Sequence, residues 1–156
     1  MSIQVGQKAP DFKLFNTEKK EISLSDYKGK NLVILFFPLA FTGVCTAELC
    51  NIRDNYNVYN SLNTEVVGIS IDSLFSLERF KKDQNYNFDL LSDFNKTVAT
   101  AYNSLYETFA FGMTGVTKRS AFVIDKNGII QYAEILEDAG KQPNFDAIKA
   151  CLEGLN

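Results

Sequence analysis

The chain has 156 residues, with 16 basic and 19 acidic side chains, three cysteines, no histidine and no tryptophan. This length suits one domain with a sizeable core, so we expect residues 1–156 to form a single domain. The formal charge of −3 offers no basic excess for phosphates, which argues against a nucleic-acid-binding protein. The missing histidine excludes Ser-His-Asp and Cys-His catalysis and histidine-ligated zinc or haem. Any reactive thiol must therefore be activated by another group.

The sequence contains no pattern typical of membrane insertion or export. The longest apolar run, 32–41, is too short to cross a membrane and is interrupted by Pro38. The amino terminus has neither the basic nor the apolar region of a secretory signal. Three cysteines without such a signal favour reduced thiols over a disulfide framework. We therefore expect a cytoplasmic protein that does not associate with membranes.

The first half of the chain alternates strand and helix patterns. Residues 12–15 and 21–24 predict two short strands joined by a polar turn, which form an N-terminal β-hairpin. The continuous apolar run 32–37 is typical of a strand buried on both faces of a sheet. Beyond it, apolar residues at spacings of three and four predict one helix over 43–62.

The same alternation continues in the second half. Residues 65–71 predict a second buried strand, and residues 73–84 predict a helix. A third apolar segment at 88–91 is followed by a predicted helix over 96–102.

The chain closes with a hairpin and a helix. Strands are predicted at 121–124 and 129–133, and the sequence Asp-Lys-Asn-Gly between them is a strong hairpin turn. The last helix is predicted over 145–155. Buried strands that alternate with helices indicate an α/β fold, with a central mixed sheet flanked by helices.

Cys45 occupies a position where chemistry is common in such folds. It lies in the first turn of the helix that follows the strongest buried strand, and ligands gather at the carboxyl ends of strands. The positive end of the helix and its unpaired N–H groups favour a thiolate there. Cys45 also shares an apolar stripe with Leu49 and Ile52, so its side chain should point inward. The residues alone leave open a reactive thiol or a small buried hydrophobe.

Cys50 follows Cys45 by five residues on the same predicted helix. That spacing places the two α-carbons about 8–9 Å apart, on faces about 140° apart. A disulfide needs α-carbons within about 7 Å, so the two can bond only if the first turns unwind. They form either a switchable redox pair or a coincidence, and they are not a C-x-x-C motif. Cys151 lies on an apolar helical face, where a core role is favoured.

Two other cysteine chemistries fit the sequence poorly. A phosphatase-type loop needs an arginine six residues after the cysteine, and that position is Asn51. The cysteine spacings contain no paired zinc ligands. We therefore expect no metal and no cofactor.

Without histidine, an arginine is the best candidate to activate the thiol. Arg53 and Arg79 have acidic neighbours, Asp54 and Glu78, which favours solvated ion pairs. Arg119 instead opens a buried strand, an unusual place for a charge. A planar, always charged donor there would stabilise a thiolate and bond an attacked oxygen. The alternative is a strand-edge arginine that reaches solvent.

Three residues near Cys45 each have a structural and a functional interpretation. Thr42 either caps the helix or uses its hydroxyl to bond the thiolate and a substrate oxygen. Pro38 ends the strand and stiffens the loop, and in its functional role it shields the thiol from solvent. Glu48 either accepts N–H bonds in the first helical turns or orients other groups of the site.

The segment 36–50, FFPLAFTGVCTAELC, closely resembles the active-site loop of the peroxiredoxin family, P-x3-T-x2-C. Further segments resemble the family in the same order, so that the resemblance covers nearly the whole chain: 8–12, 67–73, 90–94 and 118–125. The resemblance implies a thioredoxin-like fold, a single peroxiredoxin domain over 1–156, and thiol-dependent reduction of hydrogen peroxide and organic hydroperoxides.

By resemblance, Cys45 is the peroxidatic nucleophile, and Pro38, Thr42 and Arg119 are its supporting residues. Cys45 would become a sulfenic acid, which a second thiol must resolve before further oxidation. Thioredoxin or a similar dithiol would then recycle the enzyme. Hydroperoxides and a thiol reductant are therefore the expected partners.

The Cys-x4-Cys spacing looks most like the bacterioferritin-comigratory (Q-type) and AhpE-like groups of this family. In the Q-type group the second cysteine resolves the sulfenic acid after the helix unwinds, and Cys50 matches that position. AhpE-like one-cysteine members leave resolution to an external thiol, and Cys50 would then be incidental. Cys50 as the resolving residue is the favoured interpretation. A homodimer through the loops around the active site fits AhpE-like members, whereas Q-type members are often monomers.

Two functions of other classes compete with a peroxidase. A peroxide sensor or holdase chaperone would keep the fold and signal through oxidation of Cys45. A thioredoxin-like disulfide reductase is disfavoured because the chain lacks C-x-x-C. The apolar segment 106–113 is expected to border the site or a subunit interface, and Phe37, Phe41 and Phe111 are candidates for an apolar entrance.

Overall fold

The computed structural model describes residues 3–156 and places seven strands in one sheet, in the order β2-β1-β5-β4-β3-β6-β7. The strands are β1 (Lys13–Asn16), β2 (Glu21–Ser23), β3 (Asn31–Phe36), β4 (Thr64–Ser70), β5 (Asp89–Ser92), β6 (Ser120–Ile124) and β7 (Ile130–Ile135). β4 pairs in parallel with β3 and β5, and the other pairs are antiparallel. The predicted mixed sheet is therefore confirmed.

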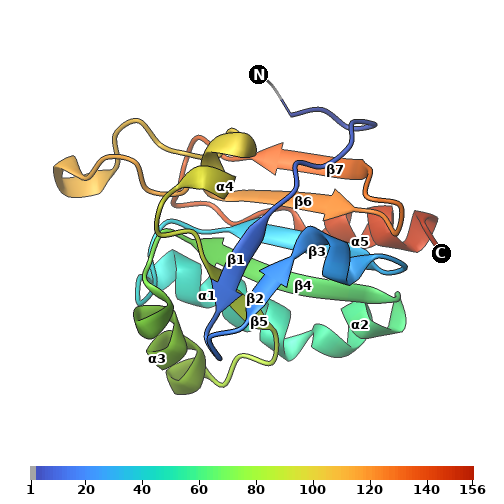
Figure 1. Cartoon of the computed structure of the whole chain (residues 1–156), viewed down its shortest axis with the longest axis horizontal. Coiled ribbons are helices and arrows are strands. Elements are labelled where there is room, and N and C mark those ends of the chain that lie inside the picture. The colour runs from blue at the N-terminus through green and yellow to red at the C-terminus, as the bar shows by residue number, and fades with distance from the viewer. Residues whose placement is uncertain (1–2) are drawn as a thin grey trace.

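Helices cover both faces of this sheet (Figure 1). They are α1 (Gly43–Asp54), α2 (Tyr56–Ser61), α3 (Leu74–Gln84), α4 (Thr97–Ala101) and α5 (Phe145–Gly154), with 3-10 turns η1 (Leu24–Tyr27) and η2 (Ala110–Gly112). Core side chains of α1, α2, α3 and α5 share one apolar cluster, and those of α4 belong to the other. The predicted α/β architecture is confirmed.

β3 is buried along its whole length because it contributes to both clusters. Val33 and Leu35 point toward α1, whereas Ile34 and Phe36 point toward α4. Each fully buried aliphatic side chain of this kind stabilises the fold by about 1.5–3 kcal/mol. The continuous apolar run thus places a rigid strand under the segment that carries Cys45.

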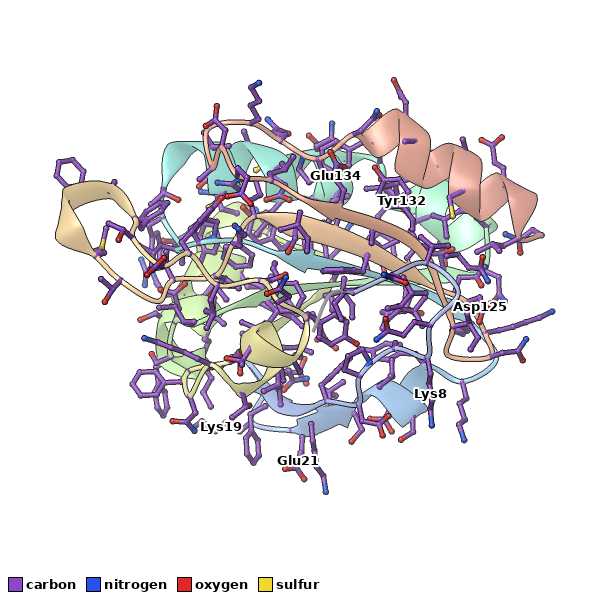
Figure 2. All side chains as sticks on the ribbon, turned by 90° about the horizontal axis from the view of Figure 1, so that it is seen from above. Lys8, Lys19, Glu21, Asp125, Tyr132 and Glu134 are labelled. Atoms are coloured by element: carbon purple, nitrogen blue, oxygen red, sulfur yellow. The ribbon has the colours of Figure 1, made fainter. Side chains whose placement is uncertain are left out.

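Both predicted hairpins form. β1 and β2 pair as the N-terminal hairpin, and β6 and β7 are joined by the turn that begins at Asp125. The Asp125 carboxylate, labelled in Figure 2, accepts hydrogen bonds from the backbone N–H groups of Asn127 and Ile129. Gly128 has a φ of +84°, a left-handed conformation that glycine adopts without a steric cost.

The prediction of one helix over 43–62 is wrong, because the segment forms two helices that meet at Asn55. The Asn55 side chain donates to the carbonyl of Asn51, while its own N–H reaches the carbonyls of both Asn51 and Ile52. Such local competition for backbone carbonyls disfavours a regular helix. The apolar periodicity continues across the break, which is why the pattern concealed it.

The topology brings two distant segments to one edge of the sheet. β6 runs antiparallel to β3, with Ser120 opposite Phe36, so the start of β6 lies at the carboxyl end of β3. Arg119 and the loop that leads to Cys45 therefore meet there. The segment between α4 and β6 extends away from the body at the same side (gold to orange in Figure 1). Within residues 3–156, no helix has both the length and the apolar character needed to span a membrane.

Candidate active site

Cys45 is the third residue of α1, and its side chain is fully buried. It packs within the cluster that contains Leu35, Phe37 and Leu49, so the predicted inward orientation is confirmed. Its position in the first helical turn places the sulfur near the positive end of the helix. Cys45 is a free thiol, as are the other two cysteines.

Arg119 is the main polar partner of this thiol. Its guanidinium donates from Nη2 to Cys45 Sγ at 3.2 Å, from Nη1 to Glu48 Oε1 at 2.7 Å, and from Nε to the carbonyl of Ala139 at 2.9 Å. Although burial disfavours its charge, Glu48 and Cys45 raise the pKa of Arg119 above its ordinary value. Arg119 therefore holds a fixed positive charge beside the sulfur. It does not reach solvent as a strand-edge residue would.

Glu48 orients Arg119 from the helix that carries Cys45. Its side chain is fully buried, and its Oε2 has no hydrogen-bond partner among the described residues. Burial raises the pKa of Glu48 to about 7, against the lowering effect of Arg119, and Glu134 adds a smaller upward contribution. Glu134 lies on β7 beside Tyr132, which donates to it (Figure 2). Glu48 thus changes its charge near neutral pH.

A Glu48→Gln variant is expected to remove a pH dependence of stability. Because the folded-state pKa of Glu48 is raised from 4.5 to about 7, the folded wild type binds an extra proton between these pH values. Wild-type stability therefore falls, relative to the variant, as the pH rises through this window. Urea unfolding measures the difference in unfolding free energy between wild type and variant. This difference is expected to change by about 2–3 kcal/mol between pH 5 and pH 8. Parallel pH profiles would contradict the assignment.

The Thr42 hydroxyl neither caps the helix nor bonds the thiolate, so these two predictions are wrong, and its predicted bond to a substrate oxygen stays a prediction. Thr42 is the N-cap residue of α1 by backbone position, yet its side chain makes no capping hydrogen bond. Its Oγ1 donates instead to the carbonyl of Leu39 at 2.7 Å, and no hydrogen bond to Cys45 is found within residues 3–156. With its hydrogen used in this way, the Oγ1 lone pairs are left to accept a bond from a ligand.

The loop before α1 is held by Asp72, whose role the sequence did not indicate. Asp72 Oδ2 accepts hydrogen bonds from the Ala40 N–H at 2.9 Å and from the Ser70 hydroxyl at 2.6 Å. Within this loop Pro38 is buried, and Phe41 has a φ of +65°, which is rare for a bulky side chain. The carboxyl end of β4 thus fixes the path of the chain toward Cys45.

Cys50 and Cys151 lie in different surroundings. Cys50 is half-buried on α1, with Sγ 3.6 Å from Gln84 Oε1 and 3.8 Å from the Tyr86 hydroxyl. Cys151 is also half-buried, packs at the edge of a core cluster, and donates to the carbonyl of Gln131. Burial raises the pKa of Cys151, which makes it less reactive. Cys151 therefore packs against the core but is not buried within it, so the predicted core role is confirmed only in part.

The predictions for the other two arginines and for the aromatic entrance are confirmed only in part. Arg53 forms the predicted ion pair with Asp54, but Arg79 pairs with Asp83, so Glu78 was the wrong partner. Phe37 is completely buried and cannot line an entrance. Phe41, in the loop before α1, and Phe111, in η2, are exposed.

The arrangement suits nucleophilic chemistry by the thiol without a metal. No group of three or more cysteine, histidine, aspartate or glutamate side chains in residues 3–156 is arranged to hold a metal ion. The Ala139 carbonyl and the Tyr106 hydroxyl, which accepts from the Arg119 N–H at 3.4 Å, were missed by sequence reasoning. Both belong to loops that reach Arg119 only in the folded chain, so no local pattern could have revealed them.

Known proteins are similar to this chain in sequence. A family model described as the AhpC/TSA family matches residues 5–133. A chloroplastic 2-cysteine peroxiredoxin of Chattonella marina var. antiqua is 42% identical over 146 residues, which cover 86% of this chain and 72% of the relative. Peroxiredoxin Bcp of Bacillus subtilis is 38% identical over 130 residues, which cover 82% of each chain.

A solved structure supports the same relationship. The crystal structure of peroxidoxin BcpB from Mycobacterium tuberculosis matches with a TM-score of 0.86 and 26% identity, over 99% of both chains. The resemblance to peroxiredoxins, and the thioredoxin-like fold that it implied, are confirmed by these matches. The chain therefore belongs to the AhpC/TSA family of peroxiredoxins and is a thiol-dependent peroxidase.

Proposed function

We propose that the chain reduces hydrogen peroxide and organic hydroperoxides with Cys45 as the peroxidatic cysteine. One observation carries this assignment: the buried contact of 3.2 Å between Arg119 Nη2 and Cys45 Sγ at the amino-terminal end of α1. A permanent positive charge beside the sulfur stabilises the thiolate, which is the nucleophilic form of cysteine.

In the first step the Cys45 thiolate attacks the distal oxygen of the hydroperoxide. An S–O bond forms as the O–O bond breaks, so that the sulfur is oxidised to a sulfenic acid and the peroxide is reduced. The leaving oxygen takes the electron pair and a proton, and departs as water or an alcohol. Arg119 and the unpaired N–H groups of the first helical turn stabilise the charge on that oxygen.

Three residues support this step. Thr42 Oγ1 accepts the hydroxyl hydrogen of the hydroperoxide, because its own hydrogen is donated to Leu39. Pro38 shields the thiol from solvent. Glu48 holds the guanidinium of Arg119 in the orientation that reaches Cys45.

Cys50 then resolves the sulfenic acid. Its thiol attacks Cys45–SOH, a Cys45–Cys50 disulfide forms, and the hydroxyl leaves as water. Thioredoxin or a similar dithiol reduces this disulfide by thiol–disulfide exchange and becomes oxidised itself. In the folded helix Cys50 contacts Gln84 and Tyr86, so the first turns of α1 must unwind before the two sulfur atoms meet.

A Cys50→Ser variant tests this assignment. Wild-type protein treated with one equivalent of hydrogen peroxide is expected to yield a Cys45–Cys50 crosslink in peptide mass spectrometry. The variant should instead accumulate a Cys45 sulfenic acid that dimedone traps, and its thioredoxin-dependent turnover should fall to background. The first oxidation of Cys45 should proceed at the wild-type rate in both proteins, because Cys50 takes no part in it.

Cys151→Ser is the matched control and is expected to retain both the crosslink and turnover. Full thioredoxin-dependent turnover of Cys50→Ser would establish the one-cysteine mechanism, in which an external thiol resolves Cys45. Stoichiometric oxidation without multiple turnovers in the wild type would instead favour a peroxide sensor or holdase.

We further propose that residues 1–156 act as one peroxiredoxin domain in the cytoplasm and pair as a homodimer. Three free thiols fit a reducing compartment. Phe111 is 99% exposed on the segment that extends away from the sheet, and Met113 and Phe41 are partly exposed. Exposed apolar surface of this kind marks interaction sites, and a second copy would cover it.

A further inference from the structure

Cys50 is held by two polar groups that come from one neighbouring segment. Its Sγ donates to Oε1 of Gln84, the last residue of α3, at 3.6 Å. It also lies 3.8 Å from the hydroxyl of Tyr86. A thiol makes only weak hydrogen bonds, but here both partners are fixed on one side of the helix.

The Tyr86 side chain is positioned rigidly against α1. It is 4% exposed and packs between Phe80 and Phe88, with ring centroids at 5.2 Å and 5.4 Å. Its hydroxyl hydrogen is shared between two acceptors on α1, the carbonyl of Thr46 at 3.4 Å and Cys50 Sγ at 3.8 Å. Burial raises the pKa of Tyr86 far above its ordinary value, so the hydroxyl keeps its proton. Tyr86 therefore contacts α1 both at Cys50 and one turn before it.

The same segment also anchors the second half of α1. Arg53 Nη1 donates to the carbonyl of Gln84, and the Asn87 side chain donates to the carbonyl of Arg53 at 3.2 Å. Unwinding between Gly43 and Cys50 would break the contacts of Cys50 and Thr46 and leave those of Arg53 in place. Local opening of the first turns is thereby separated from loss of the whole helix.

We propose that Gln84 and Tyr86 form a thiol clasp, which holds Cys50 on the folded helix and limits the rate at which Cys50 reaches oxidised Cys45. The clasp rests on the proposed function, in which Cys50 attacks Cys45–SOH and releases water. Gln84 and Tyr86 are positioning residues, because within residues 3–156 their side chains contact the sulfur of Cys50 and form no hydrogen bond to the sulfur of Cys45.

The clasp has a consequence for oxidative inactivation. While Cys50 is held, the sulfenic acid persists and can react with a second hydroperoxide, which oxidises it to a sulfinic acid. A stronger clasp lengthens that exposure, and a weaker one shortens it. Gln84 and Tyr86 therefore set the peroxide concentration at which Cys45 is overoxidised.

Tyr86→Phe tests the clasp, because it removes the hydroxyl and keeps the buried ring. Disulfide formation after one equivalent of hydrogen peroxide is expected to accelerate by about two- to fivefold, the effect of losing a hydrogen bond in the weaker half of the usual range. The ratio of sulfinic acid to disulfide at Cys45 should fall by a similar factor, while the rate of the first oxidation stays unchanged. Rapid acid quenching, alkylation and peptide mass spectrometry measure all three quantities.

Tyr102→Phe is the matched control. Its hydroxyl donates to the carbonyl of Pro10 in the other core cluster, so its loss should leave disulfide formation at the wild-type rate. Gln84→Met removes the acceptor of the Cys50 S–H, and it should accelerate disulfide formation as Tyr86→Phe does.

The other possible outcomes overturn either the clasp or the resolving role of Cys50. Equal rates in Tyr86→Phe and wild type, or equal acceleration in Tyr102→Phe, would overturn the clasp. Slower disulfide formation in Tyr86→Phe would overturn it as well, since the hydroxyl would then assist the resolving step. A wild-type chain that forms no Cys45–Cys50 disulfide would overturn the resolving role of Cys50 itself.

Discussion

Cys45→Ser is expected to reduce hydroperoxide turnover by at least about 10³-fold, as loss of a covalent nucleophile does in other enzymes. The serine hydroxyl stays protonated at neutral pH, even beside Arg119, and it cannot form a sulfenic acid. Hydrogen peroxide consumption, coupled to a thioredoxin system and followed at a fixed protein concentration, measures the loss. Because no sulfenic acid forms, dimedone should label nothing at position 45.

The loss of activity is expected without loss of the fold. Serine is close to cysteine in size, and its oxygen can still accept the hydrogen bond from Arg119 Nη2. The free energy of unfolding should therefore change by no more than about 1 kcal/mol. Cys151→Ser, in which a half-buried thiol is replaced on α5, provides the matched control and should stay active. Turnover that persists in Cys45→Ser would place the nucleophile at another residue.

Most secondary structure elements were predictable because burial imposes a period on the sequence. After Asn31, every residue of β3 is apolar, since both faces of the strand contact a core cluster. The break at Asn55 was not predictable from the same signal. It arises from a side-chain hydrogen bond to Asn51, which leaves the spacing of apolar residues on both sides unchanged.

The candidate site likewise contains residues that the sequence reveals and residues that it does not. Cys45 at a helix start and Arg119 beside a buried strand are positions where a residue type conflicts with its surroundings, and such conflicts are visible in a sequence. The partners of Arg119 and of the loop are not visible. Ala139 contributes a backbone carbonyl, and Asp72 acts across 32 residues of chain, so neither leaves a local pattern.

Two errors have identifiable physical causes. Arg79 was assigned to its neighbour in sequence, although on a helix residues four apart face each other, as Arg79 and Asp83 do. Thr42 was expected to cap the helix or bond the thiolate, and the direction of its hydroxyl depends on where the Leu39 carbonyl lies in the loop. Helix geometry would have corrected the first error, but the second requires the folded loop.

One positive charge in the site faces two groups that can each carry a negative charge. Arg119 carries one positive charge, and both Cys45 and Glu48 can balance it. Burial raises the pKa of Glu48 to about 7, so that Glu48 is partly protonated near neutral pH. When Glu48 binds a proton, the guanidinium is left to stabilise negative charge on the thiolate and on the leaving oxygen.

Arg119→Met is therefore expected to lower kcat/KM for hydrogen peroxide by about 10²–10³-fold, as removal of a donor to a developing oxyanion does. The variant should remain folded. Arg119 is the group that lowers the pKa of Glu48, so without it Glu48 takes up a proton and no unpaired buried charge is left. Stopped-flow measurement of Cys45 oxidation gives the rate, and urea unfolding confirms the fold.

Two further variants separate charge from geometry. Arg119→Lys keeps the positive charge, but one ammonium group cannot reach Cys45, Glu48 and the Ala139 carbonyl together, so it should recover only part of the lost rate. Arg79→Met removes an exposed arginine on α3 and should leave the oxidation of Cys45 unchanged. If Arg119→Met were oxidised as fast as wild type, the guanidinium would serve only to neutralise Glu48. Full recovery of the oxidation rate in Arg119→Lys would show that the positive charge alone suffices. Partial recovery assigns the rest of the rate to the three hydrogen bonds that the guanidinium makes at once in the folded chain.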